Sequence, residues 1–212
     1  LSTAPLTPET IRSAYAKIRK RCVPHCLHTR KNSLFLFKLI VPTHSSSTKP
    51  ISMRHAVNGT PCCKVSMRIL LYDKQHRVVA AVHAGWRGTV NRILAKTLHR
   101  MQSAYGTEGK DIIACIGPGI SLASFEVGDE VYEAFRTESF PMEYISVWKP
   151  ETHKHHIDLW AANRLQLSDF GVPPRQIENA GICTYEQHED FFSARRLGIK
   201  SGRILSGIMI NQ

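Results

Sequence analysis

The spacing of hydrophobic residues changes once near the middle of the chain, and this change predicts a strand followed by a helix. Residues 78–82 form a short apolar run with β-branched side chains, which is typical of a strand covered on both faces. From Val90 onward the apolar residues fall at helical spacing, which predicts a helix over residues 89–105 that ends at Gly106. His83 lies between the two, at the carboxyl end of a strand and the amino end of a helix. Ligands and anions gather at such positions.

The same pattern predicts further elements on both sides of this unit. Residues 69–72 and 78–83 should form a hairpin around a turn at residues 73–76. A helix should begin at Asp158 as its cap and stop at Gly171. The other expected elements are helices at residues 7–22 and 129–135, a possible strand at 34–41, strands at 111–116 and 204–210, and a strand ending at 182–184. Strands and helices alternate, so the pattern alone predicts one domain of the α/β or α+β class.

Composition narrows the protein class further. A chain of 212 residues with 42% hydrophobic residues is long enough to bury a sizeable core. No stretch is long and apolar enough to span a membrane, and we expect no secretory signal. Six cysteines in a chain of this length do not make a disulfide framework, so we expect a reduced, cytoplasmic protein.

The net charge of +11 is distributed unevenly. Residues 1–77 hold 14 Lys and Arg but only Glu9 and Asp73 as acids, whereas residues 78–212 hold 14 Lys and Arg and 15 acids. The acid-poor stretch at residues 27–68 has three interpretations: a basic nucleic-acid-binding arm, a folded insertion, or a segment translated from a shifted reading frame. We favour the third. Residues 1–68 are therefore treated as an atypical basic segment, expected to be partly disordered, and residues 69–212 as the main domain, which we expect to extend into that segment.

Short motifs follow one another through the main domain. They are residues 83–88 (HAGWRG), 115–120 (CIGPGI), 125–128 (FEVG), 158–160 (DLW), 181–184 (GICT) and 191–196 (FFSARR). In this order they resemble the laccase-domain family, first described as copper polyphenol oxidases and now mostly as zinc-binding purine nucleoside phosphorylases with adenosine deaminase side activity. The resemblance implies a layered α/β/β/α sandwich with mixed sheets.

The resemblance also implies a metal site with two His ligands and one Cys ligand, a set typical of catalytic zinc with one open position. His83 matches the second family His directly. The nearest equivalent of the first is His44, although the Gln that precedes it in the family is absent. Simple alignment places Ser66 where the family has Cys, so Cys63 is the candidate only after a local shift. For His44 and Cys63 an ordinary loop position is the favoured alternative. Copper is the less favoured metal, because the chain lacks the groups of His, Cys and Met that copper sites need.

Arginine and aspartate side chains in the motifs are the candidates for substrate binding and catalysis. The guanidinium of Arg87 suits bidentate binding of phosphate, and the helix start adds backbone N–H groups. Arg195, with its neighbour Arg196, is a second candidate for phosphate or ribose. A structural salt bridge is the alternative for each arginine. Asp158 is a candidate for orienting a ligand, with a helix cap as the simpler interpretation. A buried, inert thiol is the favoured interpretation of Cys183.

Two classes of function remain open from the sequence. The resemblance implies zinc-dependent phosphorolysis of a purine nucleoside such as adenosine or inosine, with adenosine deaminase and methylthioadenosine phosphorylase activity as possible additions. Its partners are then purine nucleosides and phosphate, with no membrane, in a monomer or homodimer. The alternative is an inactive family member whose basic amino-terminal segment binds nucleic acid. The three histidines at residues 153, 155 and 156 are expected to lie in a solvated loop rather than to bind metal.

Overall fold

The computed structural model describes residues 37–41, 56–57, 60–64, 67–198, 201 and 204–210. The helix expected at residues 7–22, and the positions of His44 and Ser66, lie outside these ranges. All statements below concern the described residues.

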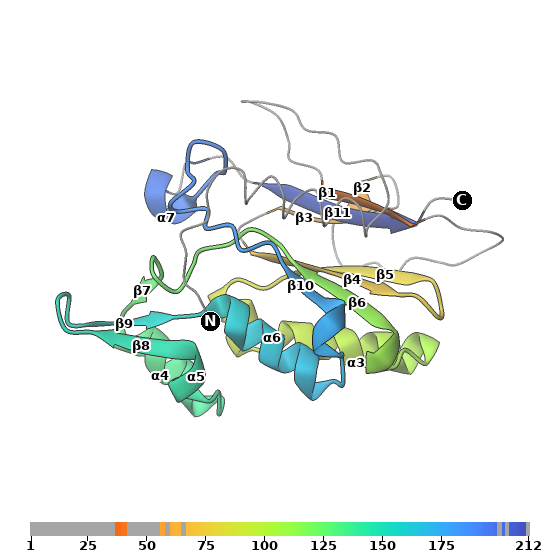
Figure 1. Ribbon diagram of the computed structural model, residues 1–212, viewed down its shortest axis with the longest axis horizontal. Coiled ribbons are helices and arrows are strands. Elements are labelled where there is room, and N and C mark those ends of the chain that lie inside the picture. The colour runs from red at the N-terminus through yellow and green to blue at the C-terminus, as the bar shows by residue number, and fades with distance from the viewer. Residues whose placement is uncertain are drawn as a thin grey trace.

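A four-stranded sheet forms the centre of the described fold (Figure 1). Its strands are β4 (Arg68–Asp73), β5 (Val78–His83), β6 (Ile112–Ile116) and β10 (Ile177–Asn179), in the order β10-β6-β4-β5. Strand β4 pairs antiparallel with both β5 and β6, so that Leu71 lies opposite Ala80 on one side and Ala114 on the other. Strand β10 runs parallel to β6. The predicted hairpin of β4 and β5 is confirmed. The apolar residues of β4 are buried, whereas in β5 only Val78 and Val82 are buried and residues 79–81 are half-buried.

A second sheet lies over one face of the central sheet (Figure 1). It consists of β1 (Phe37–Val41), β2 (Ala56–Val57), β3 (Thr60–Lys64) and β11 (Leu205–Ile210), in the order β1-β11-β3-β2. Strand β1 is parallel to β11 and β3 is antiparallel to it. The strand predicted near the carboxyl end is therefore confirmed as β11, and the one predicted at residues 34–41 as β1. Ser206 and Ile208 of β11 are buried against the central sheet.

Helices cover the opposite face of the central sheet (Figure 1). They are α2 (Trp86–Val90), α3 (Ile93–Tyr105) and α6 (Leu159–Asp169). Leu94, Leu98 and Met101 of α3 are fully buried and make the core with the strands beneath. The molecule is thus a mixed α/β protein in layers, which confirms the predicted fold class. One detail differs from the prediction: the single helix expected over residues 89–105 is divided at Arg92, whose φ of 54° is left-handed.

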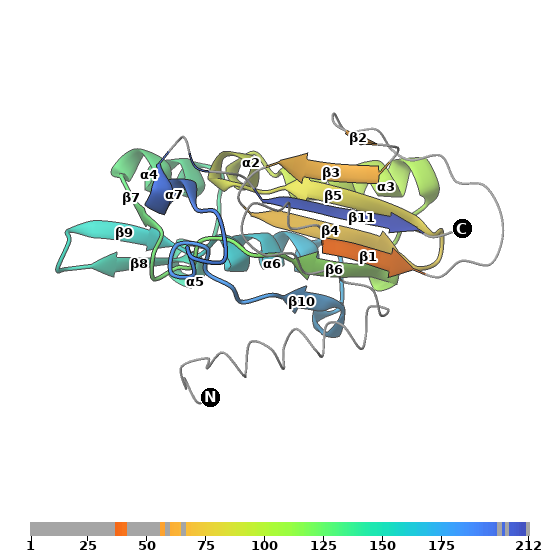
Figure 2. The ribbon, with the colours of Figure 1, turned by 90° about the horizontal axis from the view of Figure 1, so that it is seen from above.

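A smaller group of elements projects from one end of these layers (Figure 2). It contains β7 (Glu126–Val127), β8 (Ser146–Lys149) and β9 (Lys154–Ile157), in the order β7-β9-β8, with α4 (Asp129–Thr137) and α5 (Met142–Ile145). The solvated loop expected around the three histidines is wrong, because two of them lie on β9. His155 stacks on Tyr132 of α4 with ring centroids 3.8 Å apart, and His156 is buried with its Nδ1 donating to the Leu122 carbonyl at 3.0 Å.

The remaining described elements are short. They are α7 (Ala194–Leu197) and two 3-10 helices, η1 (Gly109–Asp111) and η2 (Pro174–Gln176). The strand expected to end at residues 182–184 is misplaced, because the strand is β10 and Cys183 lies in the following loop, where it forms an isolated bridge with Gly119. Within the described ranges, no helix is both long and apolar enough to cross a membrane.

Candidate functional site

The family motifs meet at one end of the central sheet. Strands β5, β6 and β10 end there and β4 begins there, because β4 is antiparallel to β5 and β6 whereas β10 is parallel to β6. Backbone hydrogen bonds fix the loops to one another. Gly117 N–H donates to the Arg68 carbonyl at 2.7 Å, and Gly119 N–H donates to the Ile182 carbonyl at 3.1 Å. Residues far apart in sequence are therefore held side by side, as at the ligand-binding end of other α/β sheets.

His83 occupies this end as the last residue of β5, and its ring is half-buried. Its Nδ1 lies 3.2 Å from the Met67 carbonyl oxygen. Because a carbonyl only accepts, Nδ1 carries the proton in this hydrogen bond, which leaves the lone pair on Nε2. An ideal Cβ at residue 85 would come within 3.2 Å of Nε2, so Gly85 keeps this nitrogen uncovered.

The surroundings of His83 favour the neutral imidazole. Burial lowers the pKa of His83, the hydrogen bond to the Met67 carbonyl partly opposes that effect, and the positive charge of Arg68 lowers the pKa further. A neutral imidazole with a free Nε2 can accept a proton or bind a metal.

Arg68 is the neighbour of His83 across the hairpin. The two residues lie directly opposite each other in the β4–β5 register, and Arg68 is only 2% exposed. Its Nη1 donates to the Ser206 hydroxyl of β11 at 3.2 Å, so the guanidinium bridges the two sheets. Ser206 is in turn paired with Cys63 in the β11–β3 register. Backbone pairing therefore brings β3, the strand of one predicted ligand, toward the sheet that carries the other.

The predicted metal-ligand set is only partly visible. His83 is described, His44 lies outside the described residues, and Cys63 lies in β3. Across the described ranges no three His, Cys, Asp or Glu side chains are grouped as a metal would require. One imidazole does not supply a coordination shell, so the described side chains alone do not fit a divalent cation.

The two candidate arginines make contacts other than the salt bridges that were their alternative interpretation. Arg87 is exposed on α2, and its guanidinium carbon lies 4.2 Å from the centroid of the Trp86 ring. The Nη1 of Arg195 donates to the Glu126 carbonyl at 2.9 Å, and its guanidinium lies 5.2 Å from the Phe125 ring. Neither arginine pairs with a carboxylate in the part of the chain that is described. Asp158 is the cap of α6, since its carboxylate accepts the Ala161 N–H at 2.9 Å.

A hydroxyl and carboxylate network near Cys183 was missed from the sequence. Glu186 accepts hydrogen bonds from the hydroxyls of Ser121 and Ser124, at 3.1 and 2.8 Å. The buried thiol of Cys183 accepts the Ser121 N–H at 3.4 Å and donates to the Ser124 hydroxyl at 3.6 Å. These residues join two loops of the sheet end across about 60 positions of sequence, and no spacing in the sequence links them. The expectation that the Cys183 thiol is buried is confirmed.

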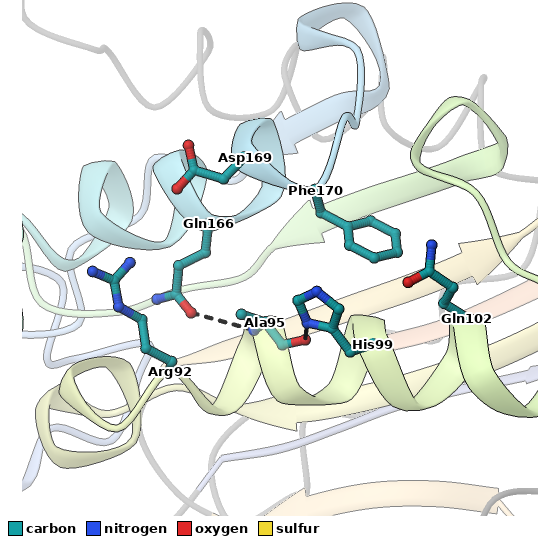
Figure 3. A pocket seen from close by; sticks show the side chains of 7 residues that line it. All are labelled: Arg92, Ala95, His99, Gln102, Gln166, Asp169 and Phe170. Carbon is teal, nitrogen blue, oxygen red and sulfur yellow. Dashed lines mark hydrogen bonds between the residues drawn. The ribbon is translucent and has the colours of Figure 1, made fainter.

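A hollow of about 300 Å³ lies on the helical face, between α3 and α6 (Figure 3). Its lining residues are Arg92, Ala95, His99, Gln102, Gln166, Asp169 and Phe170. Gln166 accepts the Ala95 N–H at 3.3 Å, and the His99 Nδ1 donates to the Ala95 carbonyl at 2.8 Å. None of the predicted site residues lines this hollow, so it is separate from the end of the sheet.

Comparisons with known proteins agree with the layered α/β fold and the motifs at the sheet end. Residues 62–211 match the family model described as multi-copper polyphenol oxidoreductase laccase. A purine nucleoside phosphorylase from Bacteroides thetaiotaomicron is 65% identical over 144 residues, which cover 68% of this chain and 53% of that protein. A protein named as an adenosine deaminase, from an unknown prokaryotic organism, is 49% identical over 152 residues, covering 72% and 56% of the two chains.

Solved structures give the same result for the fold. The crystal structure of the hypothetical protein YfiH from Bacillus licheniformis matches with a TM-score of 0.64 and 29% identity, over 70% of this chain and 56% of that one. YlmD from Geobacillus stearothermophilus matches with a TM-score of 0.62 and 31% identity, over 69% and 54%. The fold and the sheet-end motifs define a laccase-like layered α/β protein. This chain belongs to the multi-copper polyphenol oxidoreductase laccase family, and it spans about half the length of the curated relatives it matches.

Proposed function

We propose that this chain has the phosphorylase activity for which several of its relatives are named, the cleavage of purine nucleosides by phosphate. The observation that carries the proposal is the position of His83 at the sheet end, with Nδ1 held by the Met67 carbonyl and Nε2 facing Gly85. The names of the relatives support the substrate class. Adenosine or inosine with phosphate would give the free base and ribose 1-phosphate.

Arg87 is the residue that we assign to phosphate. It lies in the first turn of the helix that follows His83, and no described carboxylate neutralises it. Its fixed charge can therefore hold an oxyanion through paired N–H groups. The uncovered Nε2 of His83 could accept or return a proton as the glycosidic bond breaks. The assignment of Arg195 to phosphate or ribose is weaker, because its Nη1 already donates to the Glu126 carbonyl.

The finer expectations of the resemblance stay proposals. Zinc would need His83 together with ligands such as His44 and Cys63, and we derive no step through it. Adenosine deaminase and methylthioadenosine phosphorylase activities, and a cytoplasmic location, are expected on the same grounds. The second candidate is an inactive family member with a nucleic-acid-binding amino-terminal segment. The departure of this chain from the family's ligand motifs, with Ser66 aligned where the family has Cys, supports this alternative.

The test is phosphate-dependent release of base from adenosine and inosine, followed by chromatography. We expect release by the wild-type chain, a loss of at least about 100-fold in kcat/KM for His83→Ala, and a raised KM for phosphate in Arg87→Ala. Arg175→Ala is the matched control, because Arg175 is exposed in η2, before β10, at the opposite end of the sheet. Absence of phosphate-dependent release in the wild-type chain would overturn the proposal and favour the inactive alternative.

A further inference from the structure

A series of buried polar side chains leads from helix α6 to the turn that follows His83. Asn163 of α6 and Thr89 of α2 are both fully buried. The Asn163 amide donates to the Leu159 carbonyl at 2.8 Å and to the Thr89 hydroxyl at 3.0 Å. That hydroxyl donates in turn to the Ala84 carbonyl at 3.0 Å. The directions of these bonds are fixed, because an amide N–H only donates and a carbonyl only accepts. The series therefore ends on the residue next to His83.

Thr89 also holds the short helix α2 in place. Its N–H donates to the Gly85 carbonyl at 2.8 Å, and its own carbonyl accepts the Gln166 amide of α6 at 3.4 Å. Helix α2 has only five residues, and its N-cap is Gly85, which has no side chain to cap it. A helix of this length is not stable without tertiary contacts. The three contacts of Thr89 therefore fix α2 between the end of β5 and helix α6.

Arg87 lies on the same helix, two positions before Thr89, and its side chain is exposed. A binding group loses much of its effect when it is displaced by about 1 Å. We propose that Asn163 and Thr89 are positioning residues of the candidate site, which fix the turn after His83 and thereby place Arg87 for phosphate. Neither of them touches the substrate. The inference rests on the proposed function in taking Arg87 as the residue that binds phosphate.

The experiment measures the dissociation constant (Kd) of inorganic phosphate from the full chain by titration calorimetry at constant ionic strength. Thr89→Val removes the hydroxyl and keeps the branched shape, whereas Thr89→Ser restores the hydroxyl. Thr97→Val is the matched control, because the buried Thr97 hydroxyl also donates to a backbone carbonyl, that of Ile93 at 2.8 Å, but lies on α3. Arg87→Ala measures the binding that the guanidinium supplies. Circular dichroism checks the fold, and Asn163→Ala, which keeps the Thr89 hydroxyl, replaces Thr89→Val if the latter does not fold.

We expect phosphate to bind at least about fivefold more weakly to Thr89→Val than to the wild-type chain, with Thr89→Ser and Thr97→Val within about twofold of wild type. In Asn163→Ala the binding should weaken by at least about threefold, because Thr89 loses its donor but keeps its contact with Ala84. A general loss of stability would affect Thr97→Val as well, so this control separates positioning from stability.

The outcomes distinguish this inference from the proposed function. An unchanged Kd in Thr89→Val, equal weakening in Thr97→Val, or weakening that Thr89→Ser does not reverse would overturn the inference. If Arg87→Ala still weakens binding in those cases, the assignment of phosphate to Arg87 stands. Absence of phosphate binding by the wild-type chain would overturn both. Phosphate binding that depends on Thr89, without release of base from any nucleoside, would support the inference and count against the proposed reaction alone.

Discussion

The turn between β4 and β5 depends on one buried carboxylate, and its replacement gives the sharpest test of the fold. Asp73 has no exposed surface. One of its oxygens accepts the N–H groups of Gln75 at 2.9 Å and His76 at 3.0 Å, and the other lies 2.8 Å from the His76 Nδ1. The Thr107 hydroxyl lies beside the same carboxylate, outside the geometry of a full hydrogen bond. The carboxylate therefore holds the residues of the hairpin turn together.

The size of the effect follows from these hydrogen bonds. Asp73→Ala leaves two backbone N–H groups without their acceptor in a partly buried turn, each at about 1–3 kcal/mol. We expect the free energy of unfolding to fall by about 3 kcal/mol. Asp73→Asn retains an oxygen for the two N–H groups but loses the charge, so its loss should be about 1–2 kcal/mol. Urea unfolding followed by far-ultraviolet circular dichroism at pH 7 measures both values.

The pH dependence of the free energy of unfolding tests whether the ionised form of the Asp73 carboxylate stabilises the turn. Burial acts to raise the pKa of Asp73, but the Thr107 hydroxyl and the donors of His76 and Gln75 outweigh it, so the pKa is lowered in the folded state. A lowered folded-state pKa gives stability that is present above the unfolded value of about 3.9 and is lost as the pH falls through the folded value. The difference between wild type and Asp73→Asn should therefore shrink as the pH is lowered from 5 toward and below about 3.9. A difference that stays constant over this range, or a loss below about 1 kcal/mol in Asp73→Ala, would refute the reasoning.

The remaining predictions concern packing and capping. Gly109→Ala should destabilise the chain by more than about 3 kcal/mol, because an added Cβ would lie 2.4 Å from the Gly171 carbonyl carbon. Gly181→Ala is the control, with open space and only the strain of a φ of 64°, about 1 kcal/mol; equal losses would contradict the clash. Asn163→Ala removes buried hydrogen bonds to the Thr89 hydroxyl at 3.0 Å and the Leu159 carbonyl at 2.8 Å, so urea unfolding should show a loss of about 2 kcal/mol. Asp158→Ala should lower the free energy of unfolding by about 1 kcal/mol, because α6 loses its cap, and Asp158→Ser should restore most of this loss. Thermal unfolding measures both.

The sequence predicted correctly those elements that are determined by neighbouring residues, such as a hairpin turn, a helix cap and a helix end. The hairpin of β4 and β5 followed from two apolar runs around a polar turn, and the start of α6 followed from Asp158 as a cap before an apolar helix. Helix α3 ends at Gly106, which is left-handed with a φ of 73°, as expected for a helix stop. These features depend on residues within a few positions of one another, so the sequence alone could reveal them.

Elements that depend on tertiary contacts were missed. The break at Arg92 has no local signal, because arginine is a good helix former; its guanidinium instead donates to the Glu138 carbonyl at 2.8 Å and lies 3.8 Å from the Phe140 ring. Strand β9 looked like a polar loop because it carries Lys and His. His155 and His156 become half-buried and buried only through Tyr132 and the Leu122 carbonyl. In both places, long-range packing overrides the local preference of the residues.

The candidate site also depends on tertiary contacts that its sequence motif does not contain. The motif at residues 83–88 correctly located His83 at a strand end, next to a helix start. The surroundings of that histidine also include Arg68, which is opposite only because of the hairpin register and which donates to Ser206, 138 positions further along the chain. The same motif can place an imidazole beside a carboxylate or beside a guanidinium, yet the carboxylate raises the pKa of the imidazole and the guanidinium lowers it. The motif therefore does not determine the protonation of the histidine, because the pKa of His83 is lowered by burial and by Arg68, and only the fold brings about both effects.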